Sequence, residues 1–236
     1  MTQPPAPLAQ VSRPTLRPVE HPDQSALLTH FCHRARPQAG VPHGILQMSA
    51  PQRLESILWE SRLRAFVTYS GGDPAVCLTE ATPNGLSFLI GRRGYQPWGL
   101  VFTRQSVYDA GGGPVWYARP DEYHLVRSVN ARVKSWLVRL EPGSSDWLEE
   151  REWRIPLSND PLSGEVATEP ALPLHALHLA ALLVGDQNWS PTRTGRTTLP
   201  TGTQIQGPIV PRILIDIPRW WWDPNARQLY QLPALA

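Results

Sequence analysis

The pattern of hydrophobic and polar positions changes every few residues along this chain, and it predicts short strands more often than helices. Apolar stretches of strand length are separated by glycine, proline and charged residues. The most regular stretch is EEREWRIP, in which Trp153 and Ile155 are expected to point to one face and Glu150 and Glu152 to the other. The predicted strands are 25–32, 75–79, 98–103, 114–118, 149–156 and 213–217.

Helical spacing is limited to a few segments. Within 50–64, Leu54, Ile57 and Leu58 recur at helix spacing, and Pro51 stands near the N-terminus, where its missing N–H is no loss. A short helical turn is predicted at 82–89, a helix that passes into a strand at 173–184, and either element at 121–128 and 133–140. We therefore predict an α+β fold, a single domain with a mixed, largely antiparallel sheet of short strands and a few helices.

Proline marks the beginning of the chain as a separate region. Residues 1–24 are rich in proline and have almost no apolar periodicity, so they are expected to form a mobile arm or a strap lying over the domain. Residues 25–236, including a tryptophan-rich C-terminal tail, are expected to form the domain itself. A chain of 236 residues can bury a full core without disulfides or metal ions.

Composition narrows the function classes further. The formal net charge is +2, from 22 basic and 20 acidic residues, which argues against a broad DNA-coating surface but leaves a local arginine groove open. Two cysteines make no disulfide framework, so a reduced, cytoplasmic protein is the simplest expectation. No apolar run approaches the ~20 residues of a membrane span, and the N-terminus lacks the features of a secretory signal.

Three places carry candidate chemistry. His30 ends an early strand, Thr79 ends a middle strand, and Glu150 and Glu152 share the late strand. Glutamates two positions apart on a strand point the same way, with Cβ atoms about 7 Å apart. Such carboxylates can stabilise an oxocarbenium ion or hold a ribose hydroxyl, as glycosidic-bond chemistry requires. Each residue also has a plain structural explanation: a solvated acidic face, a capping imidazole, or a strand hydroxyl with a local partner.

A histidine, a hydroxyl residue and a glutamate on successive strands is the arrangement of ADP-ribosyltransferases. The stretch from about 28 to 185 resembles the AbiGi-type abortive-infection proteins, whose fold is similar to the ADP-ribosyltransferase fold. EREWR is the most specific part of the likeness. The matching pieces are His30, ILWESRLRA at 57–65, CLTEAT at 77–82, YQPWGLVFTR at 95–104, GGPVWYAR at 112–119 and WLEEREWRI at 147–155.

The resemblance implies NAD as a substrate and a role for each of these residues. Glu152 would be the catalytic carboxylate that holds the nicotinamide ribose, and Glu150 would act on the target as the upstream member of an E-x-E pattern. His30 would bond the adenosine-side ribose, and Thr79 would provide the middle-strand hydroxyl.

An aromatic side chain must also stack on nicotinamide, and an arginine must meet the pyrophosphate. The candidates for stacking are Tyr95, Trp98, Tyr108 and Tyr117, and those for the pyrophosphate are Arg93 and Arg104. Tyr95 and Arg104 are included among the predicted cofactor-binding residues.

Two other chemistries deserve comparison with this one. His30, Cys32, His33 and His43 lie close enough in sequence to hold zinc, but no second pair follows at finger spacing, and no metal is expected. A cysteine–histidine nucleophile built on Cys77 or Cys32 would need a lowered thiol pKa, for which the sequence offers no cause.

The predicted function is therefore NAD-dependent ADP-ribosyl transfer to a nucleic-acid or protein target, as a bacterial toxin or anti-phage defence effector. The alternative is a catalytically inactive protein of the same fold that serves as a binding partner or antitoxin subunit. An enzyme needs His30 and Glu152 to face one cleft. A partner protein needs an exposed apolar patch, for which the tryptophan run 220–222 is a candidate.

Overall fold

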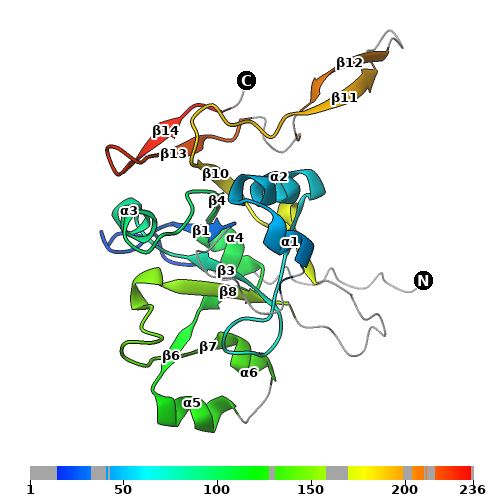
Figure 1. Cartoon of the computed structure of the whole chain (residues 1–236). Helices are drawn as coiled ribbons and strands as arrows, with labels where there is room; N and C mark the ends of the chain where they lie inside the picture. Colours follow the sequence, from blue (N-terminus) through cyan, green and yellow to red (C-terminus); the bar gives the residue numbers. More distant parts are fainter. Residues whose placement is uncertain are drawn as a thin grey trace, which may run out of the picture.

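The computed structural model describes residues 15–32, 41, 43–127, 131–157, 170–198, 204–209, 211 and 216–234. An eight-stranded sheet forms its centre, in the order β14-β13-β10-β4-β1-β3-β8-β5 (Figure 1). Neighbouring strands are antiparallel except β10 and β13, which are parallel. The strands are β1 (Leu27–Phe31), β3 (Ala75–Thr79), β4 (Gly99–Thr103), β5 (Gly113–Pro114), β8 (Glu152–Pro156), β10 (Leu179–Val184), β13 (Arg219–Asp223) and β14 (Gln228–Leu232).

Smaller elements surround this sheet. Three strand pairs are β2 (Arg62–Arg64) with β9 (Ala171–Pro173), β6 (Trp116–Ala118) with β7 (Leu137–Arg139), and β11 (Arg193–Thr198) with β12 (Gln204–Ile209). The helices are α1 (His43–Gln47), α2 (Ala50–Glu60), α3 (Pro83–Gly91), α4 (Arg104–Asp109), α5 (Pro120–Arg127) and α6 (Ala131–Trp136), and the 3-10 turns are η1 (Leu148–Glu150) and η2 (Leu174–Ala176). The predicted α+β class, with a mostly antiparallel sheet and few helices, is confirmed. Among the described helices, none has the length and apolar content needed to cross a bilayer.

Local sequence explains where α2 begins and ends. The N–H of Ser49 donates to Oε1 of Gln52 at 2.8 Å, and Pro51 occupies the first turn as predicted. Ser61 then adopts the left-handed conformation, with φ of 52°, which ends the helix after Glu60. The prediction of a helix through residue 64 was therefore wrong, because the chain turns at Ser61 into strand β2.

The two faces of the sheet pack against different helices. On one face, which we call the α2 face, buried strand residues such as Leu28, Leu78 and Ile155 pack with Leu54 and Leu58 of α2. On the other, the α3 face, side chains including Leu183 and Trp222 pack with Leu86, Leu89 and Ile90 of α3. Figure 1 shows the two helices on opposite sides of the strands. Since side chains alternate along a strand, the register decides which face each candidate residue reaches.

The tryptophan run lies in strand β13. Trp222 is buried and Trp220 packs beside it in the α3-face cluster, while Trp221 packs against the α2-face core. The run therefore does not form a contiguous exposed patch. The predicted strand 213–217 falls largely outside the described residues, which include only 216 and 217 of it.

Residues 15–24 of the N-terminal arm lie against the domain as a strap. The N–H of Leu16 donates to Oε1 of Gln105 at 2.8 Å, and its side chain packs on the α2-face core. Arg104 donates to the carbonyl of Arg17 at 2.9 Å, and Arg151 donates to the carbonyl of Asp23. These contacts hold residues 16, 17 and 23 against the domain, while residues 1–14 lie outside the described chain.

Candidate functional site

The register separates the predicted site residues into two groups. Thr29 of β1 pairs with Thr79 of β3, and Thr79 pairs with Glu152 of β8, so these three side chains share the α3 face. His30 follows Thr29 and pairs with Leu100 of the α2-face core, so it points to the opposite face. The expectation that His30 and Glu152 face one cleft is wrong. The α3 face carries Thr79, Tyr95, Glu150 and Glu152, and the α2 face carries His30 and Arg104.

Glu150 does not lie on the late strand. It ends the 3-10 turn η1, and Arg151 follows with φ of 45° before β8 begins at Glu152. The predicted pair of glutamates two positions apart on one strand is therefore wrong. The left-handed turn at Arg151, where its N–H donates to the carbonyl of Leu148, breaks the regular alternation that the sequence pattern indicates.

Glu150 nevertheless joins two other predicted residues. Its carboxylate accepts a hydrogen bond from the hydroxyl of Tyr95, and its main-chain carbonyl accepts one from the hydroxyl of Thr79. All three residues are buried. Tyr95 also packs edge-on against Phe31 of β1, with ring centroids 4.8 Å apart. The cluster thus ties turn η1 to β3 and to the chain that follows α3.

Glu152 is held by an arginine from its own strand. Nε of Arg154 donates to Oε1 of Glu152 at 2.9 Å and Nη2 donates to Oε2 at 3.0 Å, a two-pronged pair in which both side chains are at least 94% buried. The remaining nitrogen of Arg154 donates to the carbonyls of Ser135 at 2.8 Å and Leu137 at 3.3 Å. These carbonyls belong to α6 and β7, which cover this end of the α3 face.

The hydroxyl of Tyr117 lies near both glutamates. It donates to the carbonyl of Trp147 at 2.9 Å. Burial raises the pKa of Tyr117 well above its usual range, and the charges of Glu152 and Glu150 raise it further, with Arg154 opposing them. Tyr117 therefore stays protonated and remains a hydrogen-bond donor throughout the physiological range.

Arg104 belongs to a separate network on the α2 face. Glu80, buried directly after β3, accepts the indole N–H of Trp153 at 2.9 Å and Nη1 of Arg104 at 3.4 Å. Arg151 approaches the same carboxylate to 4.0 Å. The guanidinium groups of Arg104 and Arg151 also hold the strap, through the carbonyls of Arg17 and Asp23. Arg104 thus joins the buried Glu80 to the strap.

His30 connects two strands. Its Nδ1 lies 2.8 Å from the carbonyl oxygen of Cys77, and since a carbonyl only accepts, Nδ1 carries the proton and donates. The bond forms just beyond the Thr29–Thr79 pair, where β1 and β3 stop pairing. The predicted contact of His30 with a ribose stays a prediction.

Sequence reasoning missed Arg154 and Glu80. The signal for Arg154 was its position two residues after Glu152. Side chains two positions apart on a strand point to the same face, so the arginine can pair with the glutamate. The signal for Glu80 was weaker, since nothing in CLTEAT indicates that its fourth residue turns inward to meet an indole. Both residues change the chemistry of the predicted site. Arg154 balances the charge of the Glu152 carboxylate, and Glu80 accepts a hydrogen bond from Arg104, the predicted pyrophosphate ligand.

Metal and thiol alternatives gain no support from the described residues. They contain no group of three or more metal-ligating side chains, and His33 lies outside them. Burial raises the pKa of the Cys32 thiol well above its usual range, although Arg53 opposes the shift, so this thiol stays protonated.

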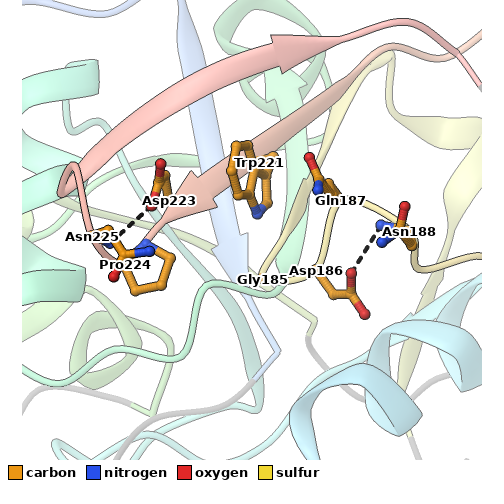
Figure 2. A pocket seen from close by; sticks show the side chains of 8 residues that line it. All are labelled: Gly185, Asp186, Gln187, Asn188, Trp221, Asp223, Pro224 and Asn225. Carbon is orange, nitrogen blue, oxygen red and sulfur yellow. Dashed lines mark hydrogen bonds between the residues drawn. The ribbon is translucent and has the colours of Figure 1, made fainter.

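Surface hollows lined by described residues occur elsewhere. One lies between the loop after β10 and the end of β13 (Figure 2), and another is lined by Met48, Gln52, Glu55, Ser56 and Arg193. None of the six predicted site residues lines either hollow.

The arrangement as a whole is a set of buried, mutually bonded polar groups. To stabilise a developing cation, Glu152 would first have to lose the guanidinium that already balances its charge. Comparisons of this chain with protein-family models, with curated proteins and with solved structures gave no match.

Proposed function

We propose that this chain is a catalytically inactive protein with an ADP-ribosyltransferase-like fold that acts by binding a protein partner. The observation that carries the proposal is the pairing of Glu152 with Arg154. Both carboxylate oxygens accept hydrogen bonds from one buried guanidinium. Catalysis of nicotinamide release needs a carboxylate whose negative charge stabilises the cation that develops on the ribose. A carboxylate already paired with a buried arginine has little negative charge left for this purpose.

The likeness to ADP-ribosyltransferases is supported by strand order. Strands β1, β3 and β8 are immediate neighbours in the sheet, and they carry His30, Thr79 and Glu152 respectively. The sequence predicts these residues on an early, a middle and a late strand. In the folded chain the three strands lie side by side. This support concerns the fold and not the activity.

Partner binding is supported by a surface patch, which we define as the exposed Val67, Tyr69 and Leu148 with the half-buried Trp147. The rings of Tyr69 and Trp147 pack edge to face with centroids 5.5 Å apart, although Tyr69 is 69% exposed. Val67 and Leu148 are also exposed, and each lies within two residues of one of the rings. Tyrosine and tryptophan are enriched at protein interfaces, because they bury a large area at little cost in side-chain entropy.

A photo-crosslinking residue tests this surface. It is placed at Tyr69 in one variant and at Tyr108 in the control, a half-exposed tyrosine on α4. In cells of the organism that encodes the chain, we expect a single crosslinked protein with the first variant and none with the second. Crosslinking that is equal at both positions, or absent at Tyr69, would remove the support for this patch.

A second candidate function is ADP-ribosyl transfer itself. It is favoured by the direct pairing of Thr79 with Glu152 and by the hydroxyls of Tyr95 and Tyr117 beside the glutamates. On this account Arg154 moves away when NAD binds. The natural chain would then transfer label from NAD to nucleic acid or protein, and Glu152→Gln would not.

A further inference from the structure

Strand β14 forms one outer edge of the eight-stranded sheet. Within the described part of the chain it pairs with β13 alone, and Figure 1 shows it at the opposite end of the sheet from β8. In an antiparallel pair, every second residue directs its N–H and C=O away from the neighbouring strand. The outer side of β14 therefore presents a row of main-chain donors and acceptors to which no described strand pairs.

Proteins usually protect such an edge against further pairing, and this sheet protects its other edge. There β5 is only 2 residues long, and one of them is Pro114, which has no N–H to donate. Strand β14 has neither protection. Residues Gln228–Leu232 include no charged residue and no proline, and they pair one to one with β13 through all 5 residues without a bulge. The edge at β14 is therefore open to a further strand.

The side chains of β14 hold the strand in the sheet and leave one aromatic ring at the surface. Leu229 packs in the α3-face cluster beside Trp222. On the α2 face, the ring of Tyr230 packs on Trp221, with centroids 5.7 Å apart and the ring planes tilted by 33°. Tyr230 nevertheless remains 42% exposed. The middle residue of the edge strand is thus an ordered tyrosine that is available for contact.

We infer that β14 pairs with β14 of a second copy of this chain, antiparallel and centred on Tyr230, so that two eight-stranded sheets join into one. A two-fold axis through Tyr230 makes both copies contribute the same strand, which is how closed dimers form. In this register Tyr230 lies opposite Tyr230 of the partner subunit. Gln228 lies opposite Leu232 of the partner subunit, and Leu229 lies opposite Gln231 of the partner subunit, so all five residues pair.

The chemistry of the edge favours an identical strand as the occupant. Because β14 is uncharged, pairing with itself sets no like charges against each other, whereas an acidic or basic strand would find no opposite charge on it. Tyrosine opposite tyrosine is a favourable cross-strand pair with Cβ atoms about 5 Å apart, and it would continue the stack of Tyr230 on Trp221 across the two-fold axis. The inference is independent of the proposed function, since the surface patch around Tyr69 takes no part in it.

Sedimentation velocity of the full chain, over a series of micromolar concentrations, tests the inference. A single pair of short strands is a small interface, so we expect a dimer that dissociates in the micromolar range. Tyr230→Lys and Tyr230→Glu each set two like charges opposite each other, and each should weaken dimerisation at least tenfold. Far-ultraviolet circular dichroism checks that both variants are folded. Tyr108→Lys, at a half-exposed tyrosine on α4, is the matched control and should dimerise as the natural chain does.

Mixing the two variants gives the most specific readout. An equimolar mixture of Tyr230→Lys and Tyr230→Glu places a lysine opposite a glutamate, so it should associate at least tenfold more tightly than either variant alone. This gain cannot arise if the substitutions merely unfold the chain. A natural chain that stays monomeric throughout the series, dimerisation unchanged in both Tyr230 variants, a loss as large in Tyr108→Lys, or a mixture that associates no better than its components would overturn the inference.

Discussion

At the residue scale, the buried Glu152–Arg154 ion pair stabilises the end of the sheet at which β8 lies. Each side chain is removed from water, and each is compensated chiefly by the other. The pair also fastens β8 to the chain around β7, because Arg154 donates to the carbonyls of Ser135 and Leu137. The hydrogen bonds of the Arg154 guanidinium therefore indicate a structural role for this residue.

Replacement of Arg154 by alanine should lower the free energy of unfolding by about 3–5 kcal/mol, since it leaves the Glu152 carboxylate buried without its counter-charge. Urea denaturation followed by circular dichroism measures the change. The double variant Glu152→Gln, Arg154→Met should recover most of the loss, and Arg119→Ala, at an exposed arginine, should change little. A loss no larger for Arg154→Ala than for Arg119→Ala would contradict a structural role for the pair.

The sequence identified several residues that do lie together, but not the faces on which they lie. Thr79, Tyr95 and Glu150 meet as a cluster, and the opposite orientation of Trp153 and Glu152 is confirmed by the burial of Trp153 in the α2-face core. The position of His30 could not be predicted, because a shift of one residue in strand register sends a side chain to the other face. Register depends on pairing between distant segments, which no local pattern contains.

At the element scale, short junctions decide where helices and strands end. Turn η1 and the left-handed Arg151 replace the first three residues of the predicted strand 149–156, and α2 ends at Glu60, four residues before the predicted end. Glu60, the last residue of α2, accepts hydrogen bonds from Arg62 and Arg64 of β2, each at 2.9 Å. The helix and the strand after it are thereby joined by one carboxylate.

The Glu60 junction predicts a pH dependence. Burial raises the pKa of Glu60, but hydrogen bonds from Ser56, Arg64 and Arg62 outweigh it and hold the pKa at about 2, below its ordinary value of 4.5. The folded state thus binds this proton more weakly than the unfolded state, so the stabilisation is full above pH 4.5 and is lost as the pH falls towards 2.

The measurement compares unfolding free energies of the natural chain and Glu60→Gln between pH 6 and pH 2. The natural chain should be the more stable at pH 6, and the difference should shrink on acidification. A difference that stays constant or grows as the pH falls would contradict the assignment.

Gly99 marks a close approach of two strands in the same sheet. A Cβ at this position would collide with the carbonyl oxygen of His30, which is main chain and cannot rotate away. Gly99→Ala should therefore destabilise the protein by about 1–3 kcal/mol, as overpacking does. Gly44→Ala is the matched control, because nothing lies within 4 Å of its added methyl group. Equal thermal midpoints for the two variants would show that β1 and β4 are not packed this closely.

At the scale of the whole molecule, the eight-stranded sheet brings together segments from both ends of the chain. The α+β class and most strands were predictable because alternation and turn residues are local signals. The split of 114–118 between β5 and β6 was not, since each short strand follows a different neighbour: β5 pairs with β8, and β6 with β7. The strap is a long-range feature too, held by Arg104 and Arg151 rather than by any pattern of its own.

The most direct test of the central claim is nicotinamide release from labelled NAD, with DNA, RNA and cell lysate present as acceptors. The claim is that the Glu152 carboxylate is a structural group, balanced by Arg154, in a protein that acts by binding. It predicts that the natural chain and Glu152→Gln both release nicotinamide at the rate of a protein-free blank and transfer no label. Release or transfer by the natural chain that disappears in a folded Glu152→Gln variant would contradict it.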